Sequence, residues 1–195
     1  MIELTVKNIL FFSKAATPGY TLFMHPVGDA SRSLPIVVGQ FEAQAIALAL
    51  EQISLERPMT HDLLSSVINT LTGGLESVAI VDLKEGTFYA RLYIRNDQKL
   101  ETMDARPSDA IALALRAGVP IMVTSKIFNE VAVNMPLSGQ GTTENEPSFS
   151  ENVKQITKQA EIRFDLEKDL REAVSREDYE QAARLRDRLL ALSDH

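Results

Sequence analysis

The side chains best suited to chemistry flank two copies of one apolar segment. Ala45–Leu50 and Ala110–Leu115 both read AIALAL, and polar residues stand close to each copy. These polar residues are Glu42, Arg57, His61, Asp62, Asp104, Arg106, Ser108 and Asp109. Carboxylates clustered with a histidine are suitable ligands for Mg²⁺ or Mn²⁺, and such ions can activate water in phosphodiester cleavage. Arg57 and Arg106 could bind phosphate in a bidentate manner, but spacing alone does not show that these residues meet.

The same residues also have a structural interpretation. Glu42 and Asp109 stand near the third position of an expected helix, where a carboxylate offsets unpaired N–H groups and the helix dipole. Asp62 could serve a helix in the same way. An internal Asp104–Arg106 pair, with Asp109 as a helix cap, would make this region a structural lock. The HExxH, P-loop, GxSxG and GxGxxG signatures are missing from the sequence, so the familiar catalytic patterns give no support.

The hydrophobic pattern predicts the elements that must position these side chains. Alternating or wholly apolar segments predict strands at residues 2–12, 20–25, 34–39, 75–83, 87–95, 99–104 and 119–124. Helices are expected at residues 40–52, from Thr60 to the Gly73-Gly74 pair, and at 107–117 and 125–131. Thr60 is the expected N-cap of its helix. One apolar face of that helix would carry Leu63, Leu64, Val67, Ile68 and Leu71.

The repeated segment indicates a duplication. Each copy follows a predicted strand, is flanked by Gly or Pro, and is apolar all round, which favours a buried helix over a strand. We therefore expect two related halves that pack together, and symmetric packing would bring the two helix starts close to each other. The predicted fold class is α+β: duplicated strand–helix units with a mostly antiparallel sheet, buried Ala/Leu-rich helices and a C-terminal α-helical hairpin.

The character of the chain changes after residue 135. Residues 136–152 are rich in Pro, Gly, Ser and Thr and predict a flexible linker. Residues 153–195 contain no Gly or Pro, and helices are expected over 153–174 and 177–192. Their apolar faces would carry Leu166, Leu170, Ala173 and Val174 on the first helix and Ala182, Leu185, Leu189 and Leu192 on the second. The predicted organisation is therefore a domain over 1–135, a linker, and a helical hairpin over 153–195.

Composition narrows the class of protein. The chain has no cysteine, which excludes disulfides and thiolate zinc sites and is in keeping with the cytoplasm. No apolar run approaches the roughly 20 residues that span a bilayer, so no membrane partner is expected. The net charge of −7 argues against a generic nucleic-acid-binding protein, but it leaves room for a nuclease that takes positive charge from metal ions.

Three segments resemble the bifunctional nuclease (BFN) domain family: LPIVVGQFEAQAIALAL at 34–50, RPMTHDL at 57–63 and DARPSDAIALALR at 104–116. The resemblance extends over roughly residues 1–135. It implies DNase and RNase activity, a nucleic-acid partner and homo-oligomers. Carried onto this chain, the motif positions suggest catalytic roles for His61, Asp62, Asp104 and Asp109 and substrate binding by Arg57, Arg106 and Ser108. A divalent metal, Mg²⁺ or Mn²⁺, would be held by Glu42, Asp104 and Asp109.

The segment LEKDLREAVSREDYEQAARLRDRLL at 166–190 resembles the UVR motif, within about residues 155–192. That motif is a helical hairpin for protein–protein contact in excision-repair proteins and some protease-associated adaptors. It implies docking to another protein, while a plain alternative is a charged hairpin that only dimerises this chain.

Two functions are therefore expected. The first is a cytoplasmic metal-dependent nuclease with a docking hairpin. The second is a non-catalytic binding or regulatory module that works through protein–protein contacts, with each carboxylate paired inside the fold.

Overall fold

The computed structural model describes residues 1–12, 19–134, 162, 165–166, 168–176 and 178–193. The chain divides into two compact units, Met1–Val153 and Lys154–His195. The predicted linker at 136–152 lies outside the described residues. None of the helices that the structure describes is both long and apolar enough to cross a membrane.

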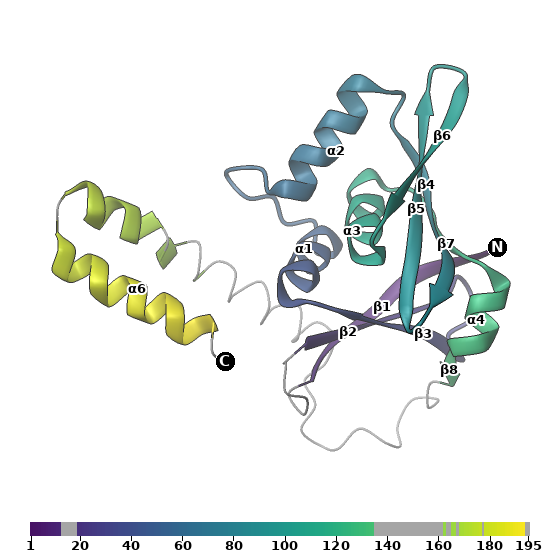
Figure 1. Ribbon diagram of the computed structural model, residues 1–195, viewed down its shortest axis with the longest axis horizontal. Helices are drawn as coiled ribbons and strands as arrows, with labels where there is room; N and C mark the ends of the chain where they lie inside the picture. The colour runs from purple at the N-terminus through teal and green to yellow at the C-terminus, as the bar shows by residue number, and fades with distance from the viewer. Residues whose placement is uncertain (13–18, 135–161, 163–164, 167, 177, 194–195) are drawn as a thin grey trace. The chain divides into compact units, whose positions relative to one another are not determined.

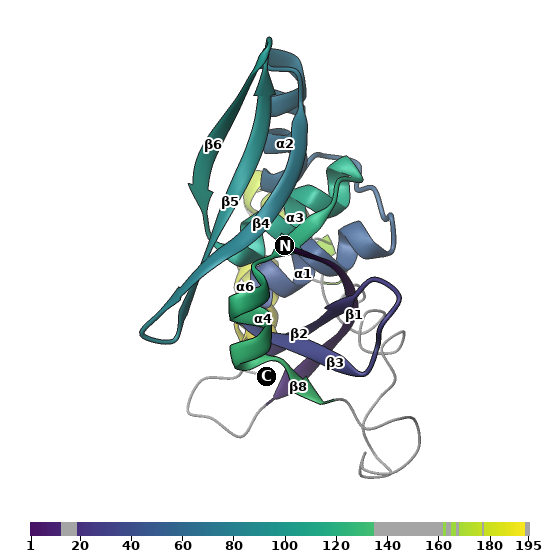
Figure 2. The same ribbon diagram turned by 90° about the vertical axis from the view of Figure 1, so that its right-hand side faces the viewer.

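An eight-stranded, mostly antiparallel sheet forms the frame of the first unit (Figure 1). Its strands are β1 (Ile2–Phe12), β2 (Gly19–Pro26), β3 (Arg32–Val38), β4 (Leu75–Lys84), β5 (Thr87–Asn96), β6 (Lys99–Ala105), β7 (Ile121–Val123) and β8 (Val133–Asn134). The order across the sheet is β6-β5-β4-β7-β1-β2-β3-β8. Strands β4–β6 and β1–β3 run in clearly different directions in Figures 1 and 2, so the sheet is strongly twisted.

The duplication expected from the sequence is visible in this order. Each half is a three-stranded antiparallel meander followed by a helix: β1-β2-β3 leads into α1 (Gln40–Leu50), and β4-β5-β6 leads into α3 (Pro107–Ala117). The short strand β7 joins the halves, antiparallel to β1 and parallel to β4. The two meanders therefore run in opposite senses on either side of β7, as a two-fold relation requires.

Helices α1 and α3 are the two copies of the repeated segment, and they pack against each other on one side of the sheet (Figure 1). Their AIALA stretches are almost wholly buried, which confirms the prediction of buried, Ala/Leu-rich helices. Alanine at alternate positions lets the two backbones approach, while Ile46 and Ile111 each contribute about 1.5–3 kcal/mol by burial. Helix α3 ends at Gly118, whose φ of 66° gives the left-handed C-cap that glycine adopts without strain.

Helix α2 (Thr60–Leu71) differs from the expectation in two ways. Its N-cap is Met59, because the Asp62 carboxylate accepts a hydrogen bond from the Met59 N–H at 2.8 Å, and Thr60 is the first helical residue. Its apolar face exists, but only Ile68 is buried on it. The other members, Leu63, Leu64, Val67 and Leu71, are exposed, so this face of the chain is left uncovered.

The remaining elements follow the pattern closely. Helix α4 (Ser125–Val131) has the predicted bounds and buries Ile127 and Phe128. Strand β7 is shorter than the segment predicted at 119–124. Strand β8 was not predicted; two residues long, it pairs with Arg32 and Ser33 of β3.

Two longer helical segments stand out among the described residues of the second unit. Residues 168–175 are helical, and α6 spans Tyr179–Ser193. Their facing sides share a small core of Leu166, Ala173, Ala182 and Leu185, with Leu170 and Leu189 packed against it. The helical hairpin is thereby confirmed. Val174, predicted on the inner face, is exposed, and the side chain of Leu192 lies outside what the structure describes.

Candidate functional site

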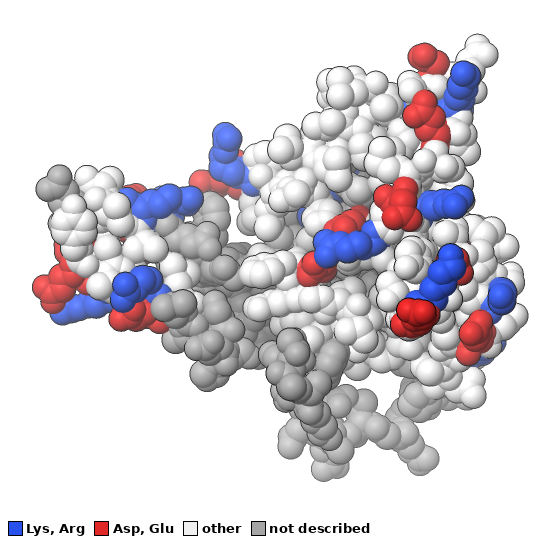
Figure 3. Space-filling model, in the orientation of Figure 1, with Lys and Arg blue, Asp and Glu red and all other residues white. Residues whose placement is uncertain are grey.

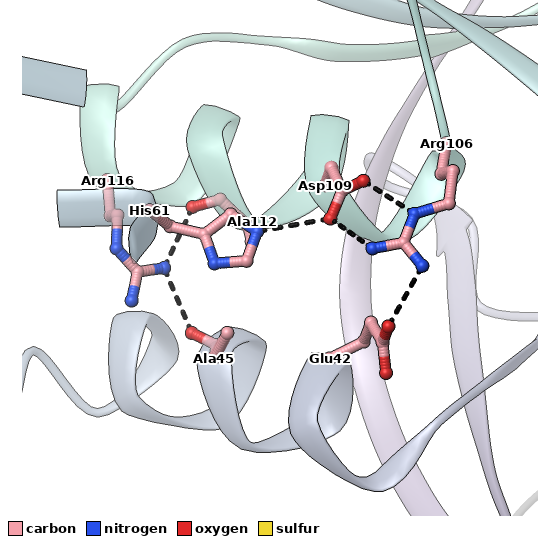
Figure 4. Close-up of polar contacts among 7 residues, drawn as sticks. All are labelled: Glu42, Ala45, His61, Arg106, Asp109, Ala112 and Arg116. Carbon is pink, nitrogen blue, oxygen red and sulfur yellow. Dashed lines mark hydrogen bonds and ion pairs between the residues drawn. The ribbon is translucent and has the colours of Figure 1, made fainter. Parts of the chain in front are cut away.

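The starts of the two repeated helices lie side by side, as Figure 4 shows. Glu42 is the third residue of α1 and Asp109 the third residue of α3, so both carboxylates sit in a first turn where unpaired N–H groups favour negative charge. Neither helix has a side-chain cap at its N-cap residue, which is Gly39 for α1 and Arg106 for α3.

Arg106 joins the two helix starts. Its Nε donates to Asp109 Oδ2 at 2.7 Å and its Nη2 donates to Asp109 Oδ1 at 3.0 Å, a bidentate ion pair. Its Nη1 donates to Glu42 Oε1 at 3.0 Å (Figure 4). The Arg106 side chain is 66% exposed, so the guanidinium lies at the surface, within reach of a ligand.

His61, the second residue of α2, contacts the same carboxylate. Its Nε2 lies 3.2 Å from Asp109 Oδ1. Burial disfavours the charged form of Asp109, but the hydrogen bonds from Arg106 and His61 outweigh it and hold the pKa of Asp109 below its ordinary value. An ionised Asp109 can only accept, so this contact favours the tautomer in which Nε2 carries the proton and Nδ1 is the unprotonated nitrogen. That Nδ1 has no hydrogen-bond partner within the described part of the chain.

A cavity of about 650 Å³ opens beside these groups. Its polar lining includes Glu42, His61, Asp104, Arg106 and Asp109, and apolar side chains make most of the rest. The apolar lining residues are Phe41, Ala45, Met59, Leu64, Leu92, Met103, Ala105 and Leu113. The structure thus brings together five of the residues that the sequence pointed to.

Asp104 faces this cavity from the end of β6 and is exposed. Its carboxylate has no hydrogen bond or ion pair to any residue that the structure describes. The internal Asp104–Arg106 pair of the structural-lock hypothesis is therefore not formed, because Arg106 contacts Asp109 and Glu42 instead.

Arg57 and Asp62 are not among the residues that line this cavity. Arg57 is exposed in the loop before α2. Asp62 uses one oxygen for the Met59 N–H and the other for Arg116 Nε at 2.5 Å. Both oxygens therefore hold α2 in place, which is a structural task.

Arg116 is a residue whose role the sequence reasoning missed. Only 11% of its side chain is exposed, and its Nη1 donates to the carbonyls of Ala45 at 2.9 Å and Ala112 at 3.0 Å (Figure 4). It thereby ties α1 and α3 together while its Nε holds Asp62. An arginine directly after the buried AIALAL segment was the signal that could have indicated such a contact.

Ser108 lies on a second cavity, of about 380 Å³, on which Glu42 and Arg106 also border. The set proposed for a metal is not assembled. Within the described residues, no three His, Cys, Asp or Glu side chains are grouped so that they could hold a metal ion. Glu42 and Asp109 both contact Arg106, whose positive charge takes the place that a cation would need.

The fold and the cavity define an α+β domain with a duplicated meander–helix unit and an acidic site at its helix starts. The chain belongs to the Bifunctional nuclease domain family, which residues 23–136 match. Residues 159–194 match the UvrB/uvrC motif. Both resemblances read from the sequence are thereby confirmed.

Three known proteins are similar in sequence to this chain. An uncharacterized protein of Mycobacterium tuberculosis is 45% identical over 108 residues, which cover 55% of this chain and 64% of the relative. Bifunctional nuclease 1 of Oryza sativa subsp. japonica is 27% identical over 187 residues, 89% of this chain and 55% of the relative. Bifunctional nuclease 2 of Arabidopsis thaliana is 26% identical over 167 residues, 80% of this chain and 50% of the relative. This chain thus spans less than two thirds of the length of these relatives.

Proposed function

We propose that this chain is a nuclease that cleaves phosphodiesters of DNA, RNA or both in the cavity beside α1, α2 and α3. The observation that carries the proposal is the His61–Asp109–Arg106 arrangement: a carboxylate holds a histidine ring, and an exposed guanidinium lies next to both. Membership of a nuclease family and the relatives named bifunctional nuclease support it.

The geometry suggests the division of labour. Asp109 accepts a hydrogen bond from Nε2–H of His61, and the free Nδ1 removes a proton from the attacking water molecule. The water oxygen bonds to phosphorus, the bond from phosphorus to the leaving oxygen breaks, and that leaving oxygen takes a proton from solvent. Arg106 swings from Glu42 to the phosphate and offsets its charge.

This role for Arg106 suits the charge distribution of the surface. On the face shown in Figure 3, described Lys and Arg side chains lie beside Asp and Glu rather than in a continuous basic stripe. Attraction of a nucleic acid then depends on local groups such as Arg106 more than on a broad positive field.

Metal dependence remains a prediction. Mg²⁺ or Mn²⁺ held by Glu42, Asp104 and Asp109 would require Arg106 to leave first, and in the present arrangement these residues do not fit the ion. We therefore assign no step of the reaction to a metal.

The test is cleavage of labelled single-stranded RNA and DNA with Mg²⁺, Mn²⁺ or a chelator. His61→Ala should lower the rate about 100-fold or more, because the general base is lost. His25→Ala is the matched control, since His25 does not line the cavity. Equal rates for wild type and His61→Ala would overturn the proposal, and a rate unaffected by the chelator would overturn metal dependence.

One observation favours the non-catalytic module instead. Glu42, Asp62 and Asp109 all pair with arginines of the same fold, which is what a structural role predicts. If purified protein cleaves none of these substrates, a binding module becomes the better interpretation.

We further propose that the second unit docks another protein. The UvrB/uvrC motif supports a recognition role for the hairpin. Two apolar side chains outside its small core, Val174 and Tyr179, are exposed and could contact a partner. A cytoplasmic location is proposed as well and fits a chain without cysteine.

We also propose a homo-oligomer that covers the exposed apolar face of α2. Leu63, Leu64, Val67 and Leu71 form this face, and Leu71 is 74% exposed. Val67→Glu should lower the mass of the particles in solution that light scattering measures, because the oligomer dissociates. Val27→Glu changes an exposed valine in the turn after β2 and should leave that mass unchanged. The same mass for wild type and Val67→Glu would contradict an interface on this face.

A further inference from the structure

The second cavity adjoins the proposed active site. Its walls are residues 35–39 at the end of β3, residues 86–88 at the β4–β5 turn, and Arg106, Pro107 and Ser108. Glu42 and Arg106 border both cavities, so the two spaces meet across this ion pair. A volume of about 380 Å³ lies in the range of small-molecule sites.

This cavity contains polar groups without partners. Ser108 is only 8% exposed, and its hydroxyl makes no hydrogen bond to any described residue. Among the described residues, Ser108 Oγ is not one of the fully buried atoms without a partner, so a ligand in the cavity can bond to this hydroxyl directly. The edge of β3 adds backbone groups, because among the described strands β8 pairs with that edge only at Arg32 and Ser33.

Charge decides which class of ligand fits. The charged residues of the lining, Arg106 and Glu42, neutralise each other at 3.0 Å. A phosphate would gain no net attraction here and would face the Glu42 carboxylate. A nucleobase is neutral, its polar edge can bond to the Ser108 hydroxyl and the β3 backbone, and its faces suit the apolar walls. Phe88 supplies an aromatic ring of the kind on which bases stack.

We propose that this second cavity binds one nucleobase of the strand that is cleaved. The strand then crosses the Arg106–Glu42 pair, with its phosphate beside Arg106 and His61 and the neighbouring base against Phe88 and Ser108. These two residues determine base preference and take no part in the chemical step. The inference rests on the proposed nuclease function for the identity of the strand.

The test uses the full chain and four ribonucleoside monophosphates, with ribose 5-phosphate and inorganic phosphate as base-free probes. Amide NMR shifts at Gly39, Gly86 and Phe88 should respond to the nucleotides and not to the base-free probes. Ser108→Ala and Phe88→Leu should each weaken binding of the preferred nucleotide about fivefold or more. Ser33→Ala is the matched control, because Ser33 is a buried serine without a hydroxyl partner that does not line the cavity.

Cleavage of an RNA of random sequence gives the second readout. Wild type should prefer one base next to the cut, and Phe88→Leu should flatten that preference while cleavage continues. Equal binding of ribose 5-phosphate and nucleotide, or no effect of either variant, would overturn the base site even if the protein is a nuclease. Base-dependent binding that is lost in both variants, in a protein that cleaves nothing, would support the site and overturn the nuclease.

Discussion

At the scale of single residues, Arg106 determines whether the acidic site can bind a phosphate. It holds Asp109 through two hydrogen bonds and Glu42 through one. A substrate phosphate must compete with both carboxylates for the guanidinium. The strength of that competition sets how tightly the site binds a nucleic acid, and Glu42 is the partner that binds Arg106 through a single contact.

Glu42 can be moved without changing any charge. A Cβ at Gly39 would overlap the Glu42 carboxylate, the movable end of a flexible side chain, and the Gly39 backbone at φ −71° accommodates alanine. Two variants test this competition: Gly39→Ala displaces the Glu42 carboxylate, and Glu42→Gln removes its charge. Each should tighten binding of single-stranded RNA by about two- to fivefold, which corresponds to the free energy of one surface ion pair. Fluorescence anisotropy measures this affinity on a His61→Ala background, in which cleavage should be slow.

Weaker binding in both variants would contradict the competition between Glu42 and phosphate. If Glu42 is instead a metal ligand, Glu42→Gln should lower the affinity for Mg²⁺, and the same titration with and without the ion separates the two roles.

The residue types of the site could be predicted from the sequence, but their partners could not. Polar residues around two apolar copies indicated the helix starts, and five of them line one cavity. Which carboxylate pairs with which arginine depends on side-chain directions after packing. For that reason Asp62, one position from His61, turns out to face Arg116 and not the cavity.

At the scale of elements, the position of α2 depends on Asp62. Burial disfavours the charged form of Asp62, yet the hydrogen bonds from Arg116 and the Met59 N–H outweigh it and lower its pKa. Arg116 in turn bonds carbonyls on α1 and α3. Three helices are thus joined at one ion pair, and His61 is carried into the cavity by the helix that this pair holds.

Asp62→Asn should lower the free energy of unfolding at pH 7 by about 1–2 kcal/mol, since the pair is partly open to solvent. Because the pKa of Asp62 is lowered by folding, its stabilisation is complete above the ordinary aspartate value of about 3.9 and is lost as the pH falls below it. The difference between wild type and variant should therefore shrink in strong acid.

Urea denaturation over a pH series measures this difference. Asp82→Asn is the control, because Asp82 pairs with Lys84 at an exposed position, and it should change stability little. A deficit in Asp62→Asn that stays constant down to pH 2 would contradict a charge-based role.

Most elements could be predicted from periodicity, since α3 and α4 have the predicted bounds. Strand β8 could not, because two residues give no pattern. The apolar face of α2 was correctly located, but its burial was not, since periodicity shows that a face exists and not what covers it.

At the scale of the whole molecule, the chain combines a duplicated α+β unit with a helical hairpin. The duplication explains why both helix starts meet, because equivalent ends of two related halves pack about β7. The hairpin has a core of its own, as a separate folding unit requires.

A chain that ends at Val153 should therefore cleave RNA within about twofold of the full-length rate, because the first unit has its own core. A partner protein that cross-links to the full chain through Tyr179 should not cross-link to this shorter chain. The two measurements are a cleavage time course and mass spectrometry of cross-linked products. Loss of cleavage by a folded shorter chain would show that the hairpin contributes to the site.

The most direct test of catalysis at the helix starts compares Asp109→Asn with Asp62→Asn. Both replace an arginine-paired aspartate by its amide, but only Asp109 lines the cavity and contacts His61. Asp109→Asn should reduce the cleavage rate about 100-fold or more, because the amide no longer fixes the His61 tautomer. Asp62→Asn acts on the site only through the position of α2, so its folded form should lose much less activity than Asp109→Asn. Equal rates for Asp109→Asn and wild type would contradict an active site at His61 and Asp109.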